Sequence, residues 1–246
     1  MSVETPEELA GLRRVGRLVA RTLRALRREV RPGVTTAELD EYAAALFVSA
    51  GATSAPRTTY GFPGTICISV NDEIVHGVPG DRVLVEGDLV TLDVTPEFDG
   101  FLADAAVTVP VGRPTLEGAR LVRAAQECLQ RAVAASVTGA PLRAIGAATE
   151  AAALRHGAFP FPELHGHGIG RRIHEEPAVP NVDVPNLPGL LTEGLVLAIE
   201  PMVTLGDTAL VTRPDGWTVA AADGGLSAHV EHTVVVHHSR PLVLTA

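Results

Sequence analysis

Apolar residues near the start of the chain recur every three or four positions, which is the pattern of one buried helix face. They are Leu9, Leu12, Val15, Val19, Leu23, Leu26 and Val30. Thr5, Pro6 and Glu8 come before most of them as an N-cap hydroxyl, a first-turn proline and a carboxylate able to reach back to the cap. The pattern predicts a helix that begins at Thr5 and ends near residues 31–33.

Three more helices and several short strands follow from the same kind of pattern. The helices are predicted at residues 35–52, 115–136 and 141–157. Short runs rich in β-branched residues predict strands at residues 64–70, 88–98, 105–111, 194–203, 217–221 and 227–238. Residues 177–188 are rich in proline and are predicted to form a loop.

The order of elements is similar in the two halves of the chain. Glu86-Gly87 aligns with Glu193-Gly194, and a carboxylate follows each glycine six positions later, Asp93 in one half and Glu200 in the other. This order predicts one α+β domain over residues 1–246, built from a duplicated unit with pseudo-repeats at roughly 5–112 and 113–237. The two carboxylates are then expected to face each other across a central cleft.

Composition narrows the class of protein. The chain has 246 residues, 46% of them hydrophobic, which is enough for a large core. Its net charge of −9 argues against general binding to nucleic acid or a membrane surface. The two cysteines, Cys67 and Cys128, are too few for a disulfide framework. With no signal-peptide pattern and no long apolar run, a soluble cytoplasmic protein is expected.

The polar face of the first predicted helix is rich in arginine. A solvated face is the simpler interpretation, and contact with RNA is the alternative. The arginines are Arg13, Arg14, Arg17, Arg21, Arg24, Arg27 and Arg28.

Carboxylates occur inside sequence runs that otherwise look like buried strands. Asp93, Glu200 and Glu231 have apolar, often β-branched neighbours, and Asp104 lies in "FLADAAVTV". A single one could mark the polar face of a strand. Four of them, together with His167 in a glycine-rich turn, form an oxygen-rich set suited to two ions of Mn, Fe, Co or Zn. Some carboxylates should then bridge the ions, which would lower the pKa of a shared water to about 7.

The motifs "GFPGTICISVNDEIVHGVPG", "VTLDVT", "FLAD", "HGHGIGRRIHEEP", "LAIEPM" and "LSAHVEHTVVV" resemble those of the type I methionine aminopeptidases. The similarity extends from about Thr5 to Val236. It implies the pita-bread fold, with two pseudo-twofold related α/β halves around a central antiparallel sheet. The first helix is expected to begin too early for the amino-terminal domain of related proline dipeptidases.

The resemblance implies a metal-ligand set that agrees with the carboxylate pattern. It implies that Asp93 chelates one divalent ion, that Asp104 and Glu231 bridge both ions, and that His167 and Glu200 complete the ligand shell of the second ion. The ions would be Co, Mn, Fe, Zn or Ni.

The resemblance also implies the catalytic and substrate-binding residues. His76 and His174 would contact the substrate, and Glu200 would carry a proton from the attacking water to the leaving nitrogen. Glycines of the His-rich stretch, at 166, 168 and 170, are expected to let the backbone bend beside the cleft.

The pocket for the first side chain is implied to include Phe62, Cys67 and Trp217, and Tyr60 is expected to contact the substrate there. Aromatic and thiol groups suit the polarizable sulfur of methionine. Asn71 matches a residue near a monovalent-cation site.

The chain departs from the family pattern at three places. Tyr60 stands where histidine is common, and Ile173 where phenylalanine is common. Ala105 and Ala106 lack hydroxyl groups that could orient Asp104. The first two changes are expected to affect the pocket, and the third to weaken metal binding about 10–100-fold.

Removal of the initiator methionine before a small second residue is therefore the predicted function. The expected partners are the N-termini of peptides and nascent chains, with a transient ribosome contact. A monomer that binds neither DNA nor membranes is expected. Two alternatives remain: an aminopeptidase of Xaa-Pro or other specificity on the same fold, and a metal-free relative that binds the ribosome or a protein through its arginine face.

Overall fold

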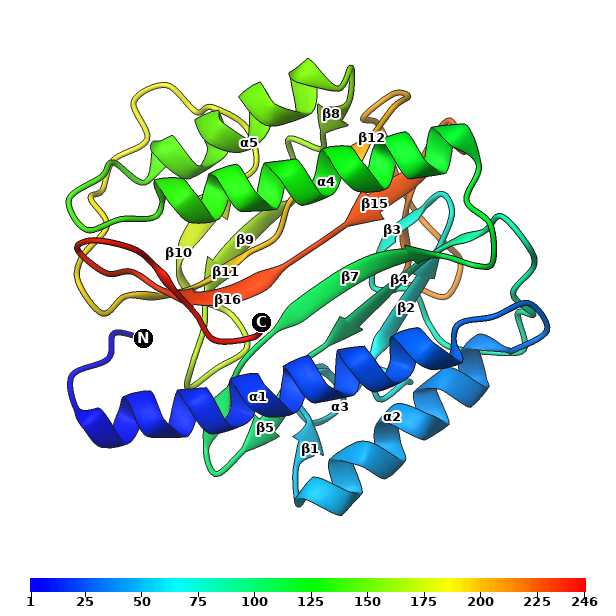
Figure 1. Ribbon diagram of the computed structural model, residues 1–246, viewed down its shortest axis with the longest axis horizontal. Helices are drawn as coiled ribbons and strands as arrows, with labels where there is room; N and C mark the ends of the chain where they lie inside the picture. The colour runs from blue at the N-terminus through cyan, green and yellow to red at the C-terminus, as the bar shows by residue number, and fades with distance from the viewer.

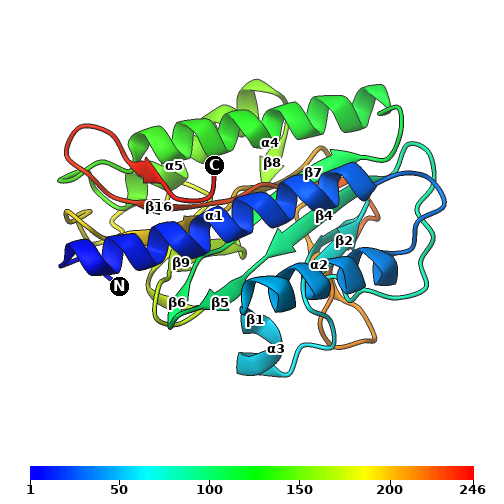
Figure 2. The ribbon, with the colours of Figure 1, turned by 60° about the horizontal axis from the view of Figure 1, so that its bottom comes forward.

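Five helices lie in two groups on either side of a set of strands (Figure 1). The computed structural model describes all 246 residues. In the turned view of Figure 2, α4 and α5 lie along one edge and α2 and α3 along the opposite one. The helices are α1 (Pro6–Glu29), α2 (Thr36–Ala50), α3 (Ala55–Tyr60), α4 (Leu116–Ala135) and α5 (Arg143–Arg155).

The N-cap predicted from the sequence begins α1, and a second cap begins α2. The Thr5 hydroxyl accepts from the backbone N–H of Glu8, and the reciprocal Glu8 carboxylate accepts from the N–H of Glu4 rather than from the cap. Thr35 and Glu38 form a complete capping box at α2. The first turn of α1 carries acidic residues, and its last turn carries Arg27 and Arg28. Charges at these positions interact favourably with the helix dipole.

All paired strands are antiparallel, in one five-stranded and four three-stranded sheets. The first half contains β1 (Thr53–Ser54), β2 (Cys67–Val70), β3 (Glu73–Val75), β4 (Leu89–Val94), β5 (Pro96–Phe98), β6 (Phe101–Leu102) and β7 (Ala105–Pro110). The second half contains β8 (Phe159–Pro160), β9 (His165–Gly168), β10 (Glu175–Pro180), β11 (Val196–Ile199), β12 (Met202–Thr204), β13 (Leu210–Thr212), β14 (Val219–Ala221), β15 (Ser227–His229), β16 (His232–Val235) and β17 (Leu242–Val243).

The two halves use the same local arrangement. β4 is central in the order β2-β4-β7, and β11 is flanked on both sides in the order β10-β9-β11-β16-β17. The glycines that precede them, Gly87 and Gly194, both have positive φ, at 92° and 82°. Their N–H groups donate to equivalent carbonyls, of Val111 and Val236. The aligned Glu-Gly pairs therefore mark equivalent turns, and descent from a duplicated unit stays a prediction.

Hydrogen bonds join the sheet edges of the two halves. The Thr108 hydroxyl donates to the His229 carbonyl and accepts from the His229 N–H, at 2.7 and 2.9 Å. Thr233 makes the same pair of bonds with the backbone of Asp104, each 2.7 Å long. The N–H of Glu231 donates to the Ala106 carbonyl at 2.9 Å. These hydrogen bonds form a seam along which the strand edges of the two halves lie side by side.

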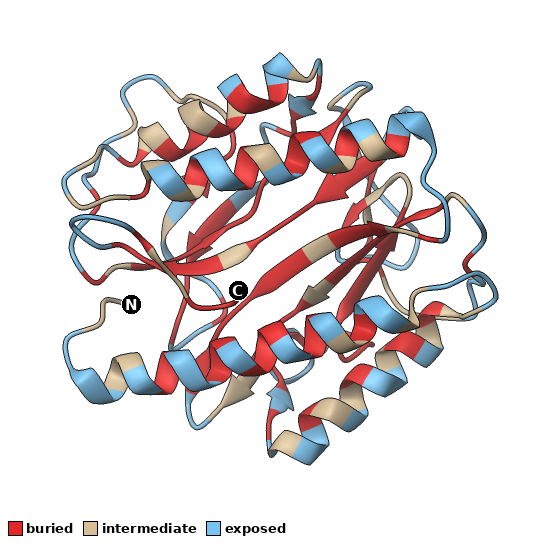
Figure 3. Ribbon diagram, viewed as in Figure 1, coloured by how far each residue is buried: buried red, intermediate tan, exposed pale blue.

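Each half has its own hydrophobic core. One cluster of 29 buried residues lies mainly between α1, α2 and the strands of the first half, and one of 21 lies mainly under α4 and α5. Figure 3 shows the strands between the helices as almost entirely buried. The predicted stripe of α1 is largely buried and its arginines are all exposed, so the helix prediction is confirmed. No helix combines the length and the apolar character needed to cross a membrane.

Some strand predictions were wrong. The segments 88–98, 194–203 and 227–238 each form two strands rather than one, and β10 lies in the segment predicted as a loop. His167 lies in β9 rather than in a turn. The breaks depend on how distant strands pair, which short sequence patterns do not contain.

Candidate metal centre and active site

Most of the acidic residues predicted as metal ligands lie at strand breaks. Asp93 lies inside β4, as predicted. Asp104 lies between β6 and β7, just before the strand predicted from residue 105. Glu200 lies between β11 and β12 and Glu231 between β15 and β16, so their placement within strands was wrong. At a break the chain leaves the strand ladder, and Pro201 has no N–H to contribute to one. The carboxylates can therefore turn toward a cavity without a cost in strand pairing.

Strand register brings these breaks together. Ile199 pairs with His232, and Met202 pairs with His229, so the breaks at Glu200 and Glu231 lie opposite each other. On the other side of the seam, Ala106 pairs with Asp93 in β4, and its carbonyl binds the N–H of Glu231. His167 enters from β9, which pairs with β11. The structure thus joins all five predicted ligands.

These five residues line a cavity of about 210 Å³. The two histidines predicted to contact substrate also line it. Asp93 and Glu200 both lie in its wall, as the alignment of the two halves predicted. A larger outer cleft of about 550 Å³ shares His165, His167 and His174 with it. The cavity is lined by Val75, His76, Asp93, Asp104, Glu163, Leu164, His165, His167, His174, Glu200, Met202 and Glu231.

Burial and mutual repulsion disfavour ionisation of the carboxylates. Desolvation raises the pKa of Asp93 and of Glu200, and the nearby Asp104 charge raises both further. Glu231 has a raised pKa for the same two reasons, and burial raises the pKa of Asp104 itself. Four such carboxylates would be stabilised together by cations placed among them.

Buried polar atoms without partners fit a bound cation. Asp104 Oδ1 and Glu231 Oε1 are shielded from solvent and make no hydrogen bond. The ring Nδ1 of His167 donates to the Gly168 carbonyl at 2.8 Å, which leaves the lone pair on Nε2, 3.4 Å from Glu200 Oε1. Burial lowers the pKa of His167 to about 4, so its ring is neutral. Oxygen ligands with neutral imidazole fit a divalent metal site.

The two predicted substrate histidines border the metal-ligand cluster. Burial lowers the pKa of His174 and of His76, although both side chains reach solvent through the cleft. The Tyr60 hydroxyl lies 2.6 Å from Nδ1 of His174. The ring of His174 also packs edge to face on that of His167, with centroids 4.3 Å apart. His76 has φ 58°, a left-handed conformation that is costly outside glycine.

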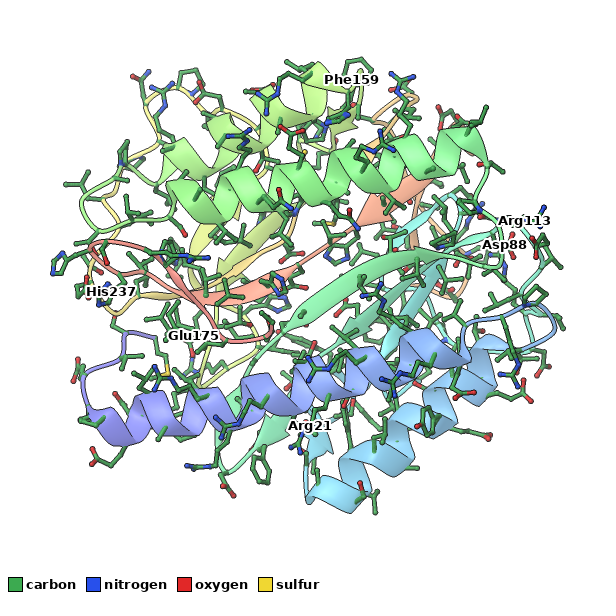
Figure 4. All side chains as sticks on the ribbon, in the orientation of Figure 1. Arg21, Asp88, Arg113, Phe159, Glu175 and His237 are labelled. Atoms are coloured by element: carbon green, nitrogen blue, oxygen red, sulfur yellow. The ribbon has the colours of Figure 1, made fainter.

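A carboxylate shapes the loop that presents His174. Glu175 accepts hydrogen bonds from the backbone N–H groups of Arg171 and Arg172, at 2.7 and 2.8 Å. It also binds the amino group of Met1, and Figure 4 labels it near the start of α1. The Glu175 side chain therefore closes this loop by accepting hydrogen bonds from its backbone.

The residues predicted for the methionine pocket do not line this cavity. Phe62 and Trp217 pack edge to face, with ring centroids 5.4 Å apart. Cys67 pairs with Asp93 across β2 and β4, and burial first, then the Asp93 charge, raises the pKa of its thiol. Tyr60 is 47% exposed.

Asn71 is held by hydrogen bonds from both halves of the chain. Its amide donates to Asp88 and accepts from the N–H of Leu89, each at 2.9 Å. Its carbonyl accepts from the N–H and the hydroxyl of Ser227. The monovalent-cation site stays a prediction.

Two glycines of the His-rich stretch are required by close packing rather than by bending. A Cβ on Gly166 would lie 2.3 Å from the Ala198 carbonyl oxygen, and one on Gly168 would lie 2.2 Å from that of Glu176. Only Gly170 of the three has positive φ. The predicted reason was therefore wrong for Gly166 and Gly168.

We expect Gly166→Ala to destabilise the protein by about 1–3 kcal/mol, because the added methyl group must push β9 away from β11. Chemical denaturation of the metal-free protein measures this. Gly33→Ala provides a comparison, because its Cβ would meet nothing within 4 Å, although its positive φ adds strain. A Gly166→Ala variant as stable as the parent chain would contradict the packing argument.

The departures from the family pattern have different structural settings. Ile173 is 5% exposed and packs into the first core rather than lining the cavity, and its effect on the pocket stays a prediction. Ala105 and Ala106 are buried, and the Thr233 hydroxyl bonds to the Asp104 backbone from the other half. This contact orients the Asp104 segment without the missing hydroxyl groups.

The structure adds residues that sequence analysis gave no role. His229 lies on the cluster and is 1% exposed. His165 and Glu163 line the cavity. A signal for His229 was present, because it precedes Glu231 by two positions and residues two apart in a strand point the same way.

Comparison with known proteins supports the same chemistry. Residues 10–238 match the model of metallopeptidase family M24. Over 246 residues the chain is 44% identical to the methionine aminopeptidase of Treponema pallidum, covering 99% of this chain and 95% of that one.

Solved structures agree with this similarity. The methionine aminopeptidase of Rickettsia prowazekii superposes with a TM-score of 0.96 at 33% identity, and the match covers all of both chains. A prolidase of Pyrococcus furiosus, 22% identical with a TM-score of 0.78 over 99% of this chain and 65% of that one, shares the fold. The α+β pita-bread fold is confirmed, and this chain belongs to metallopeptidase family M24.

Proposed function

We propose that this chain is a methionine aminopeptidase that removes the first methionine from peptides and nascent proteins whose second residue is small. The observation that supports this most is the convergence of four carboxylates and one neutral imidazole on a single cavity. Its relatives of 36–44% identity carry that name.

The five converging residues would hold two divalent ions. Asp93 would bind one ion, His167 and Glu200 would bind the other, and Asp104 and Glu231 would contribute to both. When bound, such ions act as Lewis acids and lower the pKa of water at the site toward about 7. Co, Mn, Fe, Zn and Ni all suit these ligands, and cellular supply decides among them.

Residues around the cluster handle the peptide and the proton. Glu200 accepts a proton from the attacking water and delivers it to the leaving nitrogen. We infer that the Tyr60 hydroxyl donates to Nδ1 of His174, 2.6 Å away, so that the single ring proton is on Nε2 and can be donated to the scissile carbonyl oxygen. His76 holds the amide from the opposite wall. Phe62, Cys67 and Trp217 receive the methionine side chain.

A peptide panel tests the proposal. Met-Ala-Ser should be cleaved far faster than Ala-Pro-Ser with at least one of Mn, Fe, Co and Zn. Preference for Ala-Pro-Ser would favour an Xaa-Pro aminopeptidase, and no stoichiometric metal after gentle purification would favour a non-catalytic binding role. Either result would contradict the proposal.

We expect His174→Ala to lower kcat about 10²–10³-fold, because one preorganised donor to the oxyanion is lost. Metal content should remain unchanged, since His174 contacts the ligand His167 without being a ligand itself. Steady-state kinetics and elemental analysis of the same sample check this. His165→Ala is the matched control, because it lines the same cavity without an assigned role. Joint loss of both metals would contradict the assignment.

The exposed arginines of α1 are the proposed surface for a transient contact with the ribosome. Only Arg14 of the seven forms an ion pair, with Asp99 at 3.4 Å. Arg21 lies on the side of α1 that borders α2 (Figure 4), where it lines a cleft with Leu46 and Ala50. The charge of the arginines remains available for phosphate groups. Sedimentation of the protein with ribosomes at rising salt concentration tests the contact.

A further inference from the structure

One buried histidine at the metal-ligand cluster has no assigned role. His229 ends β15 and is 1% exposed, and neither of its ring nitrogens has a hydrogen-bond partner. Burying a polar ring without a partner is costly, so such a group normally has a ligand. The seam supports its position, because Thr108 binds both the N–H and the carbonyl of His229.

The distances around His229 are too long for hydrogen bonds. Its Nε2 lies 3.7 Å from Glu200 Oε2 and 3.7 Å from Glu231 Oε2. Two atoms each about 2.1 Å from one ion, at a tetrahedral angle, lie about 3.4 Å apart. His167 Nε2 lies 3.4 Å from the other oxygen of Glu200. Glu200 thus has one imidazole nitrogen near each carboxylate oxygen.

Two groups of residues in this structure have ligand atoms close enough to share an ion. Asp104, His167 and Glu231 form the first, and Glu200, His229 and Glu231 form the second, with the atoms of each group within 4.8 Å of one another. Both groups combine two carboxylates with one buried imidazole. Because Glu231 belongs to both, the groups are adjacent.

We propose that His229 is a second imidazole ligand of the metal centre, binding a divalent ion together with Glu200 and Glu231. This inference rests on the dinuclear metal centre of the proposed function and extends its ligand set from five residues to six. A second nitrogen ligand favours Zn, Co and Ni over Mn, because imidazole suits the former ions and manganese prefers oxygen.

Nitrogen-15 NMR of the zinc-loaded protein tests the proposal directly. With histidine labelled at its ring nitrogens, zinc should shift the Nε2 signals of two buried histidines, His167 and His229. His229→Gln should remove one of these signals. A shift of one histidine only would overturn the ligand role while leaving the metal centre itself in place, and no shift of any would overturn both.

Metal affinity provides an independent measurement. Calorimetric titration of the metal-free protein should show that His229→Gln weakens Zn and Co binding about 10–100-fold and Mn binding less. His232→Gln is the matched control, since His232 lies beside Glu231 but bonds to Thr245 and is not in the cavity wall. Its affinities should stay within about twofold of the parent chain.

Thermal unfolding of the metal-free variants separates misfolding from ligand loss. If His229→Gln unfolds at the parent temperature and binds Zn and Co as tightly as the parent, the proposal is wrong. If His229→Gln does not fold, the number of histidine signals that zinc shifts in the parent protein still tests the proposal.

Discussion

Replacing Glu200 with glutamine is expected to lower kcat by at least about 10³-fold while the fold is retained. The amide cannot accept the proton of the attacking water, and general acid–base catalysis alone contributes about 10²–10⁴-fold. It also removes one anionic ligand. The fold should survive, because the contact from Asn181 is to the backbone carbonyl of Glu200.

Because Glu200 is buried, we expect Glu200→Gln to have only a small effect on the stability of the metal-free protein. The pKa of Glu200 is raised by desolvation and by the Asp104 charge, so a neutral amide of the same shape relieves repulsion in the metal-free protein. Glu163→Gln is the matched control, because Glu163 lines the cavity without an assigned role. Near-normal turnover by Glu200→Gln with its full metal content would rule out the proton-transfer role.

Removing the metal ions with a chelator is expected to abolish activity and to lower the melting temperature. An ion present at about 1,000 times its dissociation constant stabilises a protein by about 4 kcal/mol. For a domain of this size that corresponds to roughly 8–16 °C. Scanning calorimetry before chelation, after it, and after addition of Zn or Mn measures the change. Equal melting temperatures with and without metal would contradict a metal centre at these residues.

The size of this effect should depend on pH. The carboxylates have folded-state pKa values raised by burial, so without metal their contribution to stability is full below the ordinary carboxyl range and is lost as the pH rises through the raised values. Metal binding replaces those protons and is therefore tighter at high pH. The metal-induced rise in melting temperature should be larger at pH 8 than at pH 5.5. A constant rise would contradict proton competition at this cluster.

The sequence was sufficient to predict four of the five helices, all but the short α3, and to bring out the candidate metal ligands. Helix starts depend on residues three or four apart, such as Thr35 and Glu38, and these interactions form locally. The residue types of the ligands are informative even without a structure, because carboxylates within apolar runs are unusual enough to suggest a cation. All five predicted ligands line one cavity, and their individual roles remain proposals.

Strand boundaries and the reason for the glycines could not be predicted. Gly166 and Gly168 suggested a flexible turn, yet they lie in a strand where neighbouring carbonyl oxygens leave no space for a Cβ. β10 and β11 come close to these glycines because both strands pair with β9. The residues next to Gly166 and Gly168 in the sequence give no sign of this contact.

The sequence alone determined which residue types are available and which helices form, because capping and apolar periodicity act over one or two turns. Only the tertiary structure decided that Glu200 and Glu231 occupy facing strand breaks and that His229 joins them. That decision depends on the register between strands and on the seam from Thr108 to His229, whose partners are 121 residues apart. Contacts over such separations form only when the whole chain is folded.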